Sequence, residues 1–370
     1  MYRSHVTAFA LSLLFGSIVC NAPMGDETEL DEVDTPATIS SELVAPSFTA
    51  LGFPTGGTSS QATGVSGNGA VLFGTYRSST GATRGFRWSA AENFVDLGLV
   101  GGTYSTVPKA SSFDGSTIVG RSSPSGGFQW TKSAGILKFG DTLYDEVTGT
   151  SGDGSTLVGN RPFYWRAGSF TPLSSVSGGV SGVSKDGNTI VGTSSNFAFR
   201  WSQSLGLQSL GGMGSCVSSV DLPSTGSSAS AVSENGSAVV GQTFYSVNIG
   251  KLNRSACPRA AYRWTAGGGF RRIPFLGAGL SAAAKDVSAN GAVVVGASAT
   301  SGFSGISAFR WTSAAGTKDL KAELLALGVT SVSNYILQDA TGISDDGTVI
   351  VGTALNTVTK KLESYRAVLP

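Results

Sequence analysis

A Ser-x-(Asp/Asn)-Gly motif recurs seven times in this chain, and it offers the carboxylate and hydroxyl oxygens with which proteins bind calcium. The copies begin at Ser66, Ser112, Ser151, Ser184, Ser233, Ser288 and Ser344. Asn replaces Asp in three copies, at Asn68, Asn235 and Asn290, and a calcium site would lose charge by that exchange. A tight turn would tolerate it, because both residues, when followed by Gly, reverse the chain readily. The motif therefore predicts seven hairpin turns, and we expect no metal site and no cofactor.

A cluster of basic residues could bind an anion. Between residues 251 and 272 the chain has six basic residues and no acidic one. Guanidinium and ammonium groups bind carboxylates and phosphates, so an acidic polysaccharide or a lipopolysaccharide is a candidate ligand. The alternative is a solvated charged surface. The candidate ligand-binding residues are Lys251, Arg254, Arg259, Arg271 and Arg272.

Residues for catalysis are scarce. His5 is the only histidine and lies in a segment that we expect to be removed, which excludes Ser-His-Asp and Cys-His arrangements. No phosphate-binding loop follows a strand. The acids on variable loops form no recognisable pair; they are Asp141, Asp145, Glu146, Asp221 and Asp339. No catalytic residue is assigned, and a carboxylate-dependent polysaccharide hydrolase or lyase is the alternative to a binding protein.

Each motif copy lies in a repeat of four short strands, a to d. In the fourth copy these are Val180–Val183, Thr189–Gly192, Ala198–Trp201 and Leu207–Gly211, and the Ser-x-Asp-Gly turn joins a to b. All six Trp residues occupy one position of strand c, two residues after another aromatic residue. This spacing puts both rings on one face of the strand and predicts core packing between adjacent sheets. The Arg between the rings in most copies should contact the other neighbouring sheet; these are Arg87, Arg200, Arg263, Arg310 and Arg366.

The repeat length predicts an all-β fold, a seven-bladed β-propeller with four-stranded antiparallel blades. Successive motif glycines are 33 to 56 residues apart, as in propeller blades. The seventh copy ends at strand c, Tyr365–Pro370, whereas Ser47–Gly52 aligns with strand d of the first copy. We therefore expect the N-terminal strand to complete the last blade. The only stretch that predicts a helix is Leu320–Leu327.

Loop lengths point to one face of the ring. The a–b turn never varies in length, whereas the b–c and d–a connections do, and both emerge on the same side, which we call the decorated face. Function concentrates on loops held by a rigid scaffold, so a site is expected there. The fifth copy has two long loops, with Cys216 in one and Cys257 in the other, and a disulfide between them is predicted.

The N-terminal residues predict export. Residues 1–22 resemble a signal peptide, with Arg3 followed by the apolar run Ala8–Val19. Cys20 follows directly, so lipidation of Cys20 and plain secretion are both open. Residues 23–45 hold seven acids and no Lys or Arg, which is typical of a disordered tether. The propeller spans 46–370, and its mild excess of basic residues is not the footprint of a nucleic-acid binder.

The combination of Phe197-Ala-Phe-Arg-Trp201 or Ser307-Ala-Phe-Arg-Trp311 with the turn motif resembles the bacterial extracellular HAF repeat over nearly all of 61–370. The His that gives that repeat its name is absent from every copy here. The resemblance implies a place in the cell envelope or outside the cell, without an agreed activity. We therefore expect an exported, monomeric, non-enzymatic scaffold that binds an anionic glycan or a protein partner, with no nucleic acid and with membrane contact only through a lipid anchor.

Overall fold

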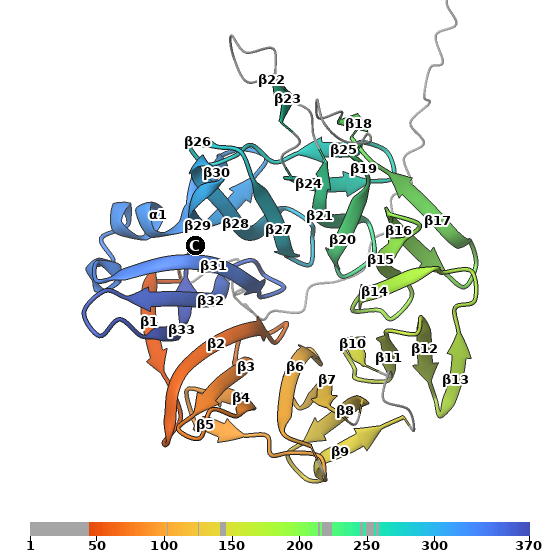
Figure 1. The fold of residues 1–370 in the computed structure, drawn as a ribbon, viewed down its shortest axis with the longest axis horizontal. Coiled ribbons are helices and arrows are strands. Elements are labelled where there is room, and N and C mark those ends of the chain that lie inside the picture. Colours follow the sequence, from red (N-terminus) through yellow and green to blue (C-terminus); the bar gives the residue numbers. More distant parts are fainter. Residues whose placement is uncertain are drawn as a thin grey trace, which may run out of the picture. The chain divides into compact units, whose positions relative to one another are not determined.

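Seven four-stranded antiparallel sheets follow one another around a ring in the computed structural model, which confirms the predicted seven-bladed β-propeller (Figure 1). The structure describes residues 44–370 except 102, 125, 141–145, 214, 217–223, 245–246, 249–254 and 257–258. The predicted signal peptide and nearly all of the predicted tether therefore lie outside the described residues, and residues 43–370 form one compact unit.

The strands of the first four blades follow the chain. Blade 1 holds β2 (Gly57–Val65), β3 (Val71–Ser78), β4 (Thr83–Ser89) and β5 (Asn93–Asp96). Blade 2 holds β6 (Ser105–Ser111), β7 (Thr117–Ser123), β8 (Gly126–Thr131) and β9 (Gly135–Phe139). Blade 3 holds β10 (Val147–Thr150), β11 (Thr156–Gly159), β12 (Phe163–Arg166) and β13 (Ser169–Pro172). Blade 4 holds β14 (Gly178–Val183), β15 (Ile190–Ser194), β16 (Phe197–Ser202) and β17 (Gly206–Gly211).

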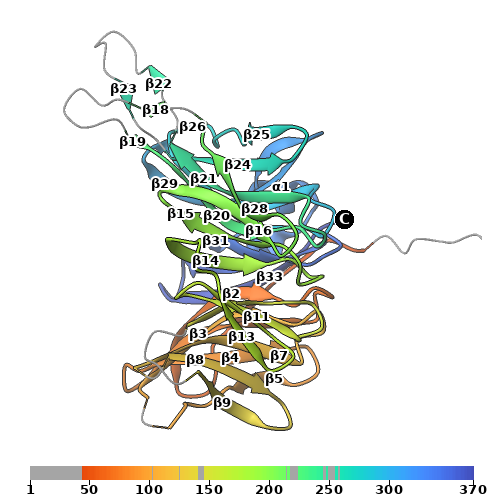
Figure 2. The same cartoon turned by 90° about the vertical axis from the view of Figure 1, so that its right-hand side faces the viewer.

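The later blades carry additional short elements. Blade 5 holds β20 (Ser227–Val232), β21 (Ala238–Phe244), β24 (Arg259–Thr265) and β25 (Gly269–Arg272). Blade 6 holds β27 (Ala282–Val287), β28 (Val293–Gly302), β29 (Ser304–Thr312) and β30 (Gly316–Asp319), and β26 (Ala278–Gly279) pairs with β28. Two small sheets, β18 (Ser215–Cys216) with β19 (Ser224–Thr225) and β22 (Val247–Asn248) with β23 (Ser255–Ala256), lie beside blade 5 (Figures 1 and 2).

The chain closes the ring as predicted. Blade 7 holds β31 (Tyr335–Ile343), β32 (Val349–Asn356), β33 (Leu362–Val368) and, as its fourth strand, β1 (Ser47–Gly52). Strands β1 and β33 pair antiparallel, with Ser47 opposite Val368 and Phe48 opposite Ala367. The first described strand therefore covers the edge that β33 would otherwise leave open.

The aromatic positions of strand c form the core, as predicted. The first aromatic residue of strand c is at most 1% exposed in all seven blades, including blade 7, which has no Trp: Phe86, Phe128, Phe163, Phe199, Tyr262, Phe309 and Tyr365. Trp130 and Trp311 are buried, and the other four Trp residues are partly buried. Tyrosine replaces phenylalanine in two blades, and its hydroxyl then donates to a carbonyl of strand a, from Tyr262 to Ser228 at 3.1 Å and from Tyr365 to Asp339 at 2.8 Å.

In blades 1, 4 and 5 the Arg residue of strand c contacts the next blade, as predicted. The guanidinium groups of Arg87 and Arg200 lie over the Trp rings of the following blades, 6.0 and 5.8 Å from the ring centroids. Nε of Arg263 donates to the carbonyl of Gly291 at 2.6 Å. Nη1 of Arg310 pairs with Glu323 at 2.8 Å.

The predicted helix is present as α1 (Leu320–Ala326), followed by the short 3-10 helix η2 (Thr330–Val332). Asp319 caps α1, because its carboxylate accepts a hydrogen bond from the Ala322 N–H at 2.9 Å. Leu320 and Leu324 of α1 are fully buried between blades 6 and 7. Among the described residues, no helix is long and apolar enough to span a membrane.

Candidate functional site

The Ser-x-(Asp/Asn)-Gly segments are hairpin turns, as predicted. Oγ of Ser184 accepts from the Thr189 N–H at 2.9 Å and donates to Asp186, whose carboxylate also accepts from the Asn188 N–H. The glycine that ends the motif has a φ between 69° and 81° in all seven copies. In the third copy, hydrogen bonds from Ser151 and Ser155 lower the pKa of the Asp153 carboxyl to about 2. The polar groups of the motif are thus occupied by the turn itself.

These turns also meet one another at one end of the central channel, which we call the turn end. A backbone hydrogen bond joins each turn to the next around the ring, for example from Phe113 N to Gly152 O at 2.7 Å and from Gly152 N to Lys185 O at 2.8 Å. The bond from Asp345 N to Gly67 O, at 2.8 Å, closes the circle between blades 7 and 1. The motif position x therefore lies at the mouth of the channel, where it is occupied by Gly67, Phe113, Gly152, Lys185, Glu234, Ala289 and Asp345.

A β-bulge in every strand a turns one residue into the channel. At the position three residues before the motif serine, the pairing of strands a and b skips one residue in every blade, for example between Val180 and Gly182 in blade 4. Such bulges re-aim a side chain. The seven skipped residues, which we call the bulge ring, are all polar: Thr63, Lys109, Thr148, Ser181, Ser230, Lys285 and Thr341. They line a central cavity of about 210 Å³.

The bulge also explains the glycine that lies five residues after each turn. A Cβ added at Gly192 would lie less than 3.0 Å from the carbonyl oxygen of Gly179 in strand a, and the other six copies repeat this close approach. The φ of Gly192 is not in the left-handed region, so space alone requires glycine here.

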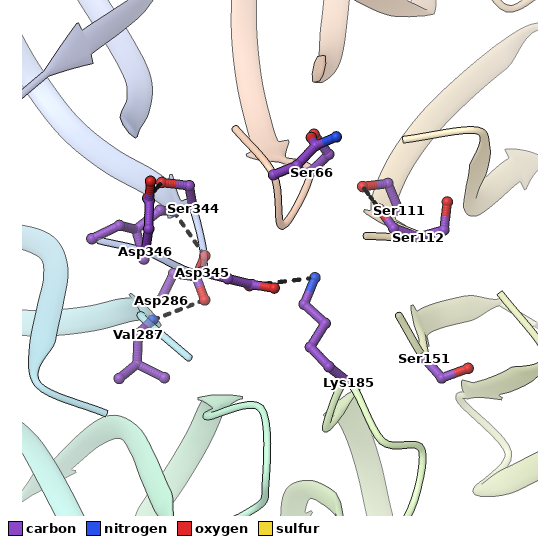
Figure 3. Close-up of polar contacts among 12 residues, drawn as sticks. Ser66, Ser111, Ser112, Ser151, Lys185, Asp286, Val287, Ser344, Asp345 and Asp346 are labelled. Atoms are coloured by element: carbon purple, nitrogen blue, oxygen red, sulfur yellow. Dashed lines mark hydrogen bonds and ion pairs between the residues drawn. The ribbon is translucent and has the colours of Figure 1, made fainter. Parts of the chain in front are cut away.

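Asp286 departs from the repeat inside the channel. The residue two before the motif serine is Gly or Ala in the other six blades: Gly64, Ala110, Gly149, Gly182, Ala231 and Gly342. Blade 6 has Asp286, whose Oδ1 accepts from the Val287 N–H and whose Oδ2 accepts from the Ile343 N–H of blade 7, both at 2.9 Å (Figure 3). Burial raises the pKa of the Asp286 carboxyl to about 6, although these two N–H groups oppose the rise.

The three lysines that line the channel each pair with an acid. Lys109 lies 3.3 Å from Glu146 of blade 3. Lys285 lies 3.4 Å from Asp339 of blade 7. Lys185 lies 3.8 Å from Asp345 across the mouth. The lysine charges are therefore balanced within the protein. Within the described ranges, no three His, Cys, Asp or Glu side chains are placed to hold a metal ion.

A second cavity, of about 280 Å³, opens on the decorated face between blades 4 and 5. Thr193 and Asn196 of blade 4 line one side, and Gln242, Phe244 and Arg259 of blade 5 line the other. The Arg259 side chain is exposed, with its guanidinium 5.6 Å from the centroid of the Phe244 ring. Asn196, with a φ of 68°, forms part of the b–c turn and lines the cavity.

Among the predicted basic residues that the structure describes, Arg259 lies apart from Arg271 and Arg272. Arg259 lines the second cavity, whereas Arg271 and Arg272 lie on the outer strand β25 and, as neighbours in a strand, point to opposite faces. Arg271 stacks over the Trp311 ring at 5.7 Å and Arg272 over the Phe275 ring at 5.5 Å. Lys251 and Arg254 lie outside the described residues.

The predicted cysteine chemistry falls on residues whose side chains are not described. Cys20 and Cys257 lie outside the described residues, and Cys216 is placed only as part of the backbone of β18. The disulfide and the lipid anchor therefore stay predictions.

The comparisons with known proteins show the fold. No protein-family model matches the chain, and no curated protein sequence matches it. Solved structures do: U3-55K is 12% identical with a TM-score of 0.53, and the match covers 88% of this chain and 100% of that one. An oligogalacturonate lyase in complex with manganese is 11% identical with a TM-score of 0.50, covering 88% of this chain and 97% of that one. A chain of the mitotic checkpoint complex is 13% identical with a TM-score of 0.45, covering 95% and 99%. At such identities, these are likenesses of fold alone.

Proposed function

We propose that the protein is an exported binding scaffold without enzymatic activity, and that it binds an anionic glycan at the cavity between blades 4 and 5. The observation that carries this proposal is the exposed guanidinium of Arg259 at the rim of that cavity. Asn196, Gln242 and Thr193, whose side chains carry amide or hydroxyl groups, line the same cavity. Such groups bind sugar hydroxyls, while the guanidinium binds a carboxylate or sulfate. A protein partner with an acidic loop is the alternative ligand.

The small size of the cavity that Asp286 and Asp345 share favours binding over cleavage by a hydrolase or a lyase. Asp286 and Asp345 line a common cavity, and paired carboxylates are what a glycosidase needs. That cavity has a volume of only about 70 Å³, which corresponds to about two water molecules. A sugar ring with a glycosidic bond does not fit between these two carboxylates, so they support a role other than cleavage.

An affinity measurement with matched variants tests the glycan proposal. The full chain is titrated with polygalacturonate and alginate beside the variants Arg259→Gln and Arg121→Gln. Arg121 is also exposed, but it lies on blade 2, so it serves as the control. We expect Arg259→Gln to weaken binding about tenfold or more, since a charged hydrogen bond is worth about 1.5–3 kcal/mol, and Arg121→Gln to leave it unchanged.

Two outcomes would contradict the proposal. Absence of binding to either polymer by the parent protein would remove the anionic glycan as a ligand. Equal loss of affinity in both variants would indicate non-specific attraction by positive charge, which salt near 0.5 M would also abolish because its Debye length is only about 4 Å.

We also propose a place in the cell envelope or outside the cell, in line with the HAF-repeat resemblance and the apolar run Ala8–Val19. Metabolic labelling with a fatty acid tests the anchor. Label in the parent protein that disappears in Cys20→Ser would establish lipidation. Export without label in either would favour plain secretion, and retention of both in the cytoplasm would contradict the proposal.

A further inference from the structure

The central channel has polar walls that the packing of the blades does not require. Every member of the bulge ring carries a hydroxyl or an ammonium group, whereas the residue just before it in each strand is a buried Ala, Val or Pro. The same strands thus bury apolar residues between the blades and turn polar ones into the cavity of about 210 Å³.

Asp286 is the clearest departure from the repeat in this cavity. The other six blades have Gly or Ala at the equivalent position, so the fold does not need a carboxylate there. No Lys or Arg nitrogen pairs with Asp286 among the ion pairs of the described residues. Its two hydrogen bonds come from backbone N–H groups, which hold the carboxylate in one orientation at the channel wall. Each carboxylate oxygen keeps a further acceptor position.

The charge balance of the channel argues against an anionic ligand. Lys109, Lys185 and Lys285 already pair with acids, so a ligand carboxylate would have to displace an existing partner. The ligand carboxylate would also be repelled by Asp286 and, at the turn end, by Asp345 and Glu234. Hydroxyl groups face no such obstacle, because they donate to carboxylates and accept from ammonium groups and serine or threonine hydroxyls.

We propose that the central channel is a second binding site, separate from the cavity at Arg259, and that it takes a neutral, hydroxyl-rich ligand the size of one sugar residue. The Asp286 carboxylate accepts hydrogen bonds from the ligand hydroxyls, and the bulge ring supplies the surrounding donors and acceptors. The volume of the cavity fits this class, because it lies below the roughly 300–1,000 Å³ of sites for drug-sized molecules and far above the space of one water.

Calorimetry with single sugars tests this site. The full chain is titrated with D-glucose, D-galactose, D-mannose and N-acetyl-D-glucosamine, and with D-glucuronate as the charged counterpart. We expect at least one neutral sugar to bind with a Kd in the millimolar range, about 1–10 mM. In the Arg259→Gln variant, which weakens the other proposed site, glucuronate should bind at least about tenfold more weakly than that neutral sugar. Asp286→Ala places the residue of blades 2 and 5 at this position, so it should fold, and it should weaken binding at least about tenfold.

Three controls keep the test decisive. Arg121→Gln should leave sugar binding unchanged. Asp286→Asn keeps the volume and one acceptor, and it replaces Asp286→Ala if that variant does not fold. Titration with an oligosaccharide that ends in the bound sugar distinguishes a site for free sugars from a site for the end of a glycan. Only a site for a glycan end would bind the oligosaccharide more tightly than the single sugar. The proposal is overturned if no neutral sugar binds up to about 50 mM, if the Asp286 variants bind as tightly as the parent, or if the Arg259→Gln variant binds glucuronate more tightly than the neutral sugar.

Discussion

The Nζ atom of Lys185 lies 3.8 Å from the Asp345 carboxylate, although Lys185 follows β14 of blade 4 and Asp345 follows β31 of blade 7. Blades 4 and 7 are three places apart in a ring of seven, so the pair spans the channel and does not join neighbours. Figure 3 shows Lys185 extending toward Asp345 at the turn end, with Asp286 beside them. The turn motif therefore has two roles, since it reverses the chain and carries the side chains that cross the channel mouth.

The ion pair should contribute little to stability. Both side chains are partly exposed, at 26% and 18%, and such pairs are worth about 0–1 kcal/mol. The backbone hydrogen bonds between neighbouring turns hold the ring of turns together without it. A double-mutant cycle with Lys185→Met and Asp345→Asn, measured by urea unfolding, should give a coupling free energy below about 1 kcal/mol. A coupling above about 2 kcal/mol would make the pair a structural element.

Asp286 should make the stability of the fold depend on pH. Its pKa is about 6 in the folded protein and about 3.9 in an unfolded chain, so the folded state binds the proton more tightly. The protonated carboxyl therefore adds to the free energy of unfolding. This contribution is fully present below pH 4 and is lost as the pH rises through 6. Relative to Asp286→Ala, the parent should therefore lose up to about 3 kcal/mol of unfolding free energy between pH 4 and 7.5. The charged neighbours Lys185, Asp345 and Glu234 are present in both proteins.

Unfolding by urea at both pH values measures this difference. If Asp286→Ala is destabilised relative to the parent by the same amount at pH 4 and at pH 7.5, the account is contradicted. The main role of Asp286 would then be to accept the hydrogen bond from Ile343.

Two glycines of blade 4 should respond differently to substitution by alanine. Gly192→Ala would push a methyl group into the carbonyl of Gly179 and should cost about 2–4 kcal/mol of unfolding free energy. Gly182→Ala is the matched control, because no atom lies within 4 Å of its added Cβ and blades 2 and 5 carry Ala there. It should change stability by less than about 0.5 kcal/mol. Similar melting temperatures for the two variants would contradict the close approach of strands a and b.

The closing strand β1 should be necessary for stability. Phe48 is 7% exposed and contacts the rings of Tyr335 and Tyr365, with centroids 5.2 and 5.7 Å away. Phe48→Ala should lower the unfolding free energy by about 3 kcal/mol, whereas Thr49→Ala, on the exposed side of the same strand, should change it by less than about 0.5 kcal/mol. Equal thermal stability of both variants would show that β1 is not needed to close the ring.

Residues that recur made the fold predictable. The ring pair ending at Trp201, the turn at Ser184 and the missing strand after Tyr365 each follow from positions that have the same role in every blade. The site depends on residues that do not recur. Asp286 could have been found from the sequence, because it is the one acid at a repeat position that otherwise holds Gly or Ala. Lys185 and Asp345 could have been found as charged residues at position x of the turn motif.

The bulges could not have been predicted. A residue such as Ser181 carries no sign that it faces the channel, because only the pairing of Val180 and Gly182 with β15 turns it inward. The stacking of Arg271 on Trp311 was also hidden, since these residues come from neighbouring blades and their contact depends on the ring.

Hydrogen exchange with and without polygalacturonate tests most directly the central claim that this propeller binds a glycan on its decorated face. The account predicts slower exchange of the backbone amides in 193–196, 226–228 and 242–244, which surround Arg259, and unchanged exchange in the a–b turns. Protection confined to the turns, or no protection at a polymer concentration that saturates binding, would contradict it.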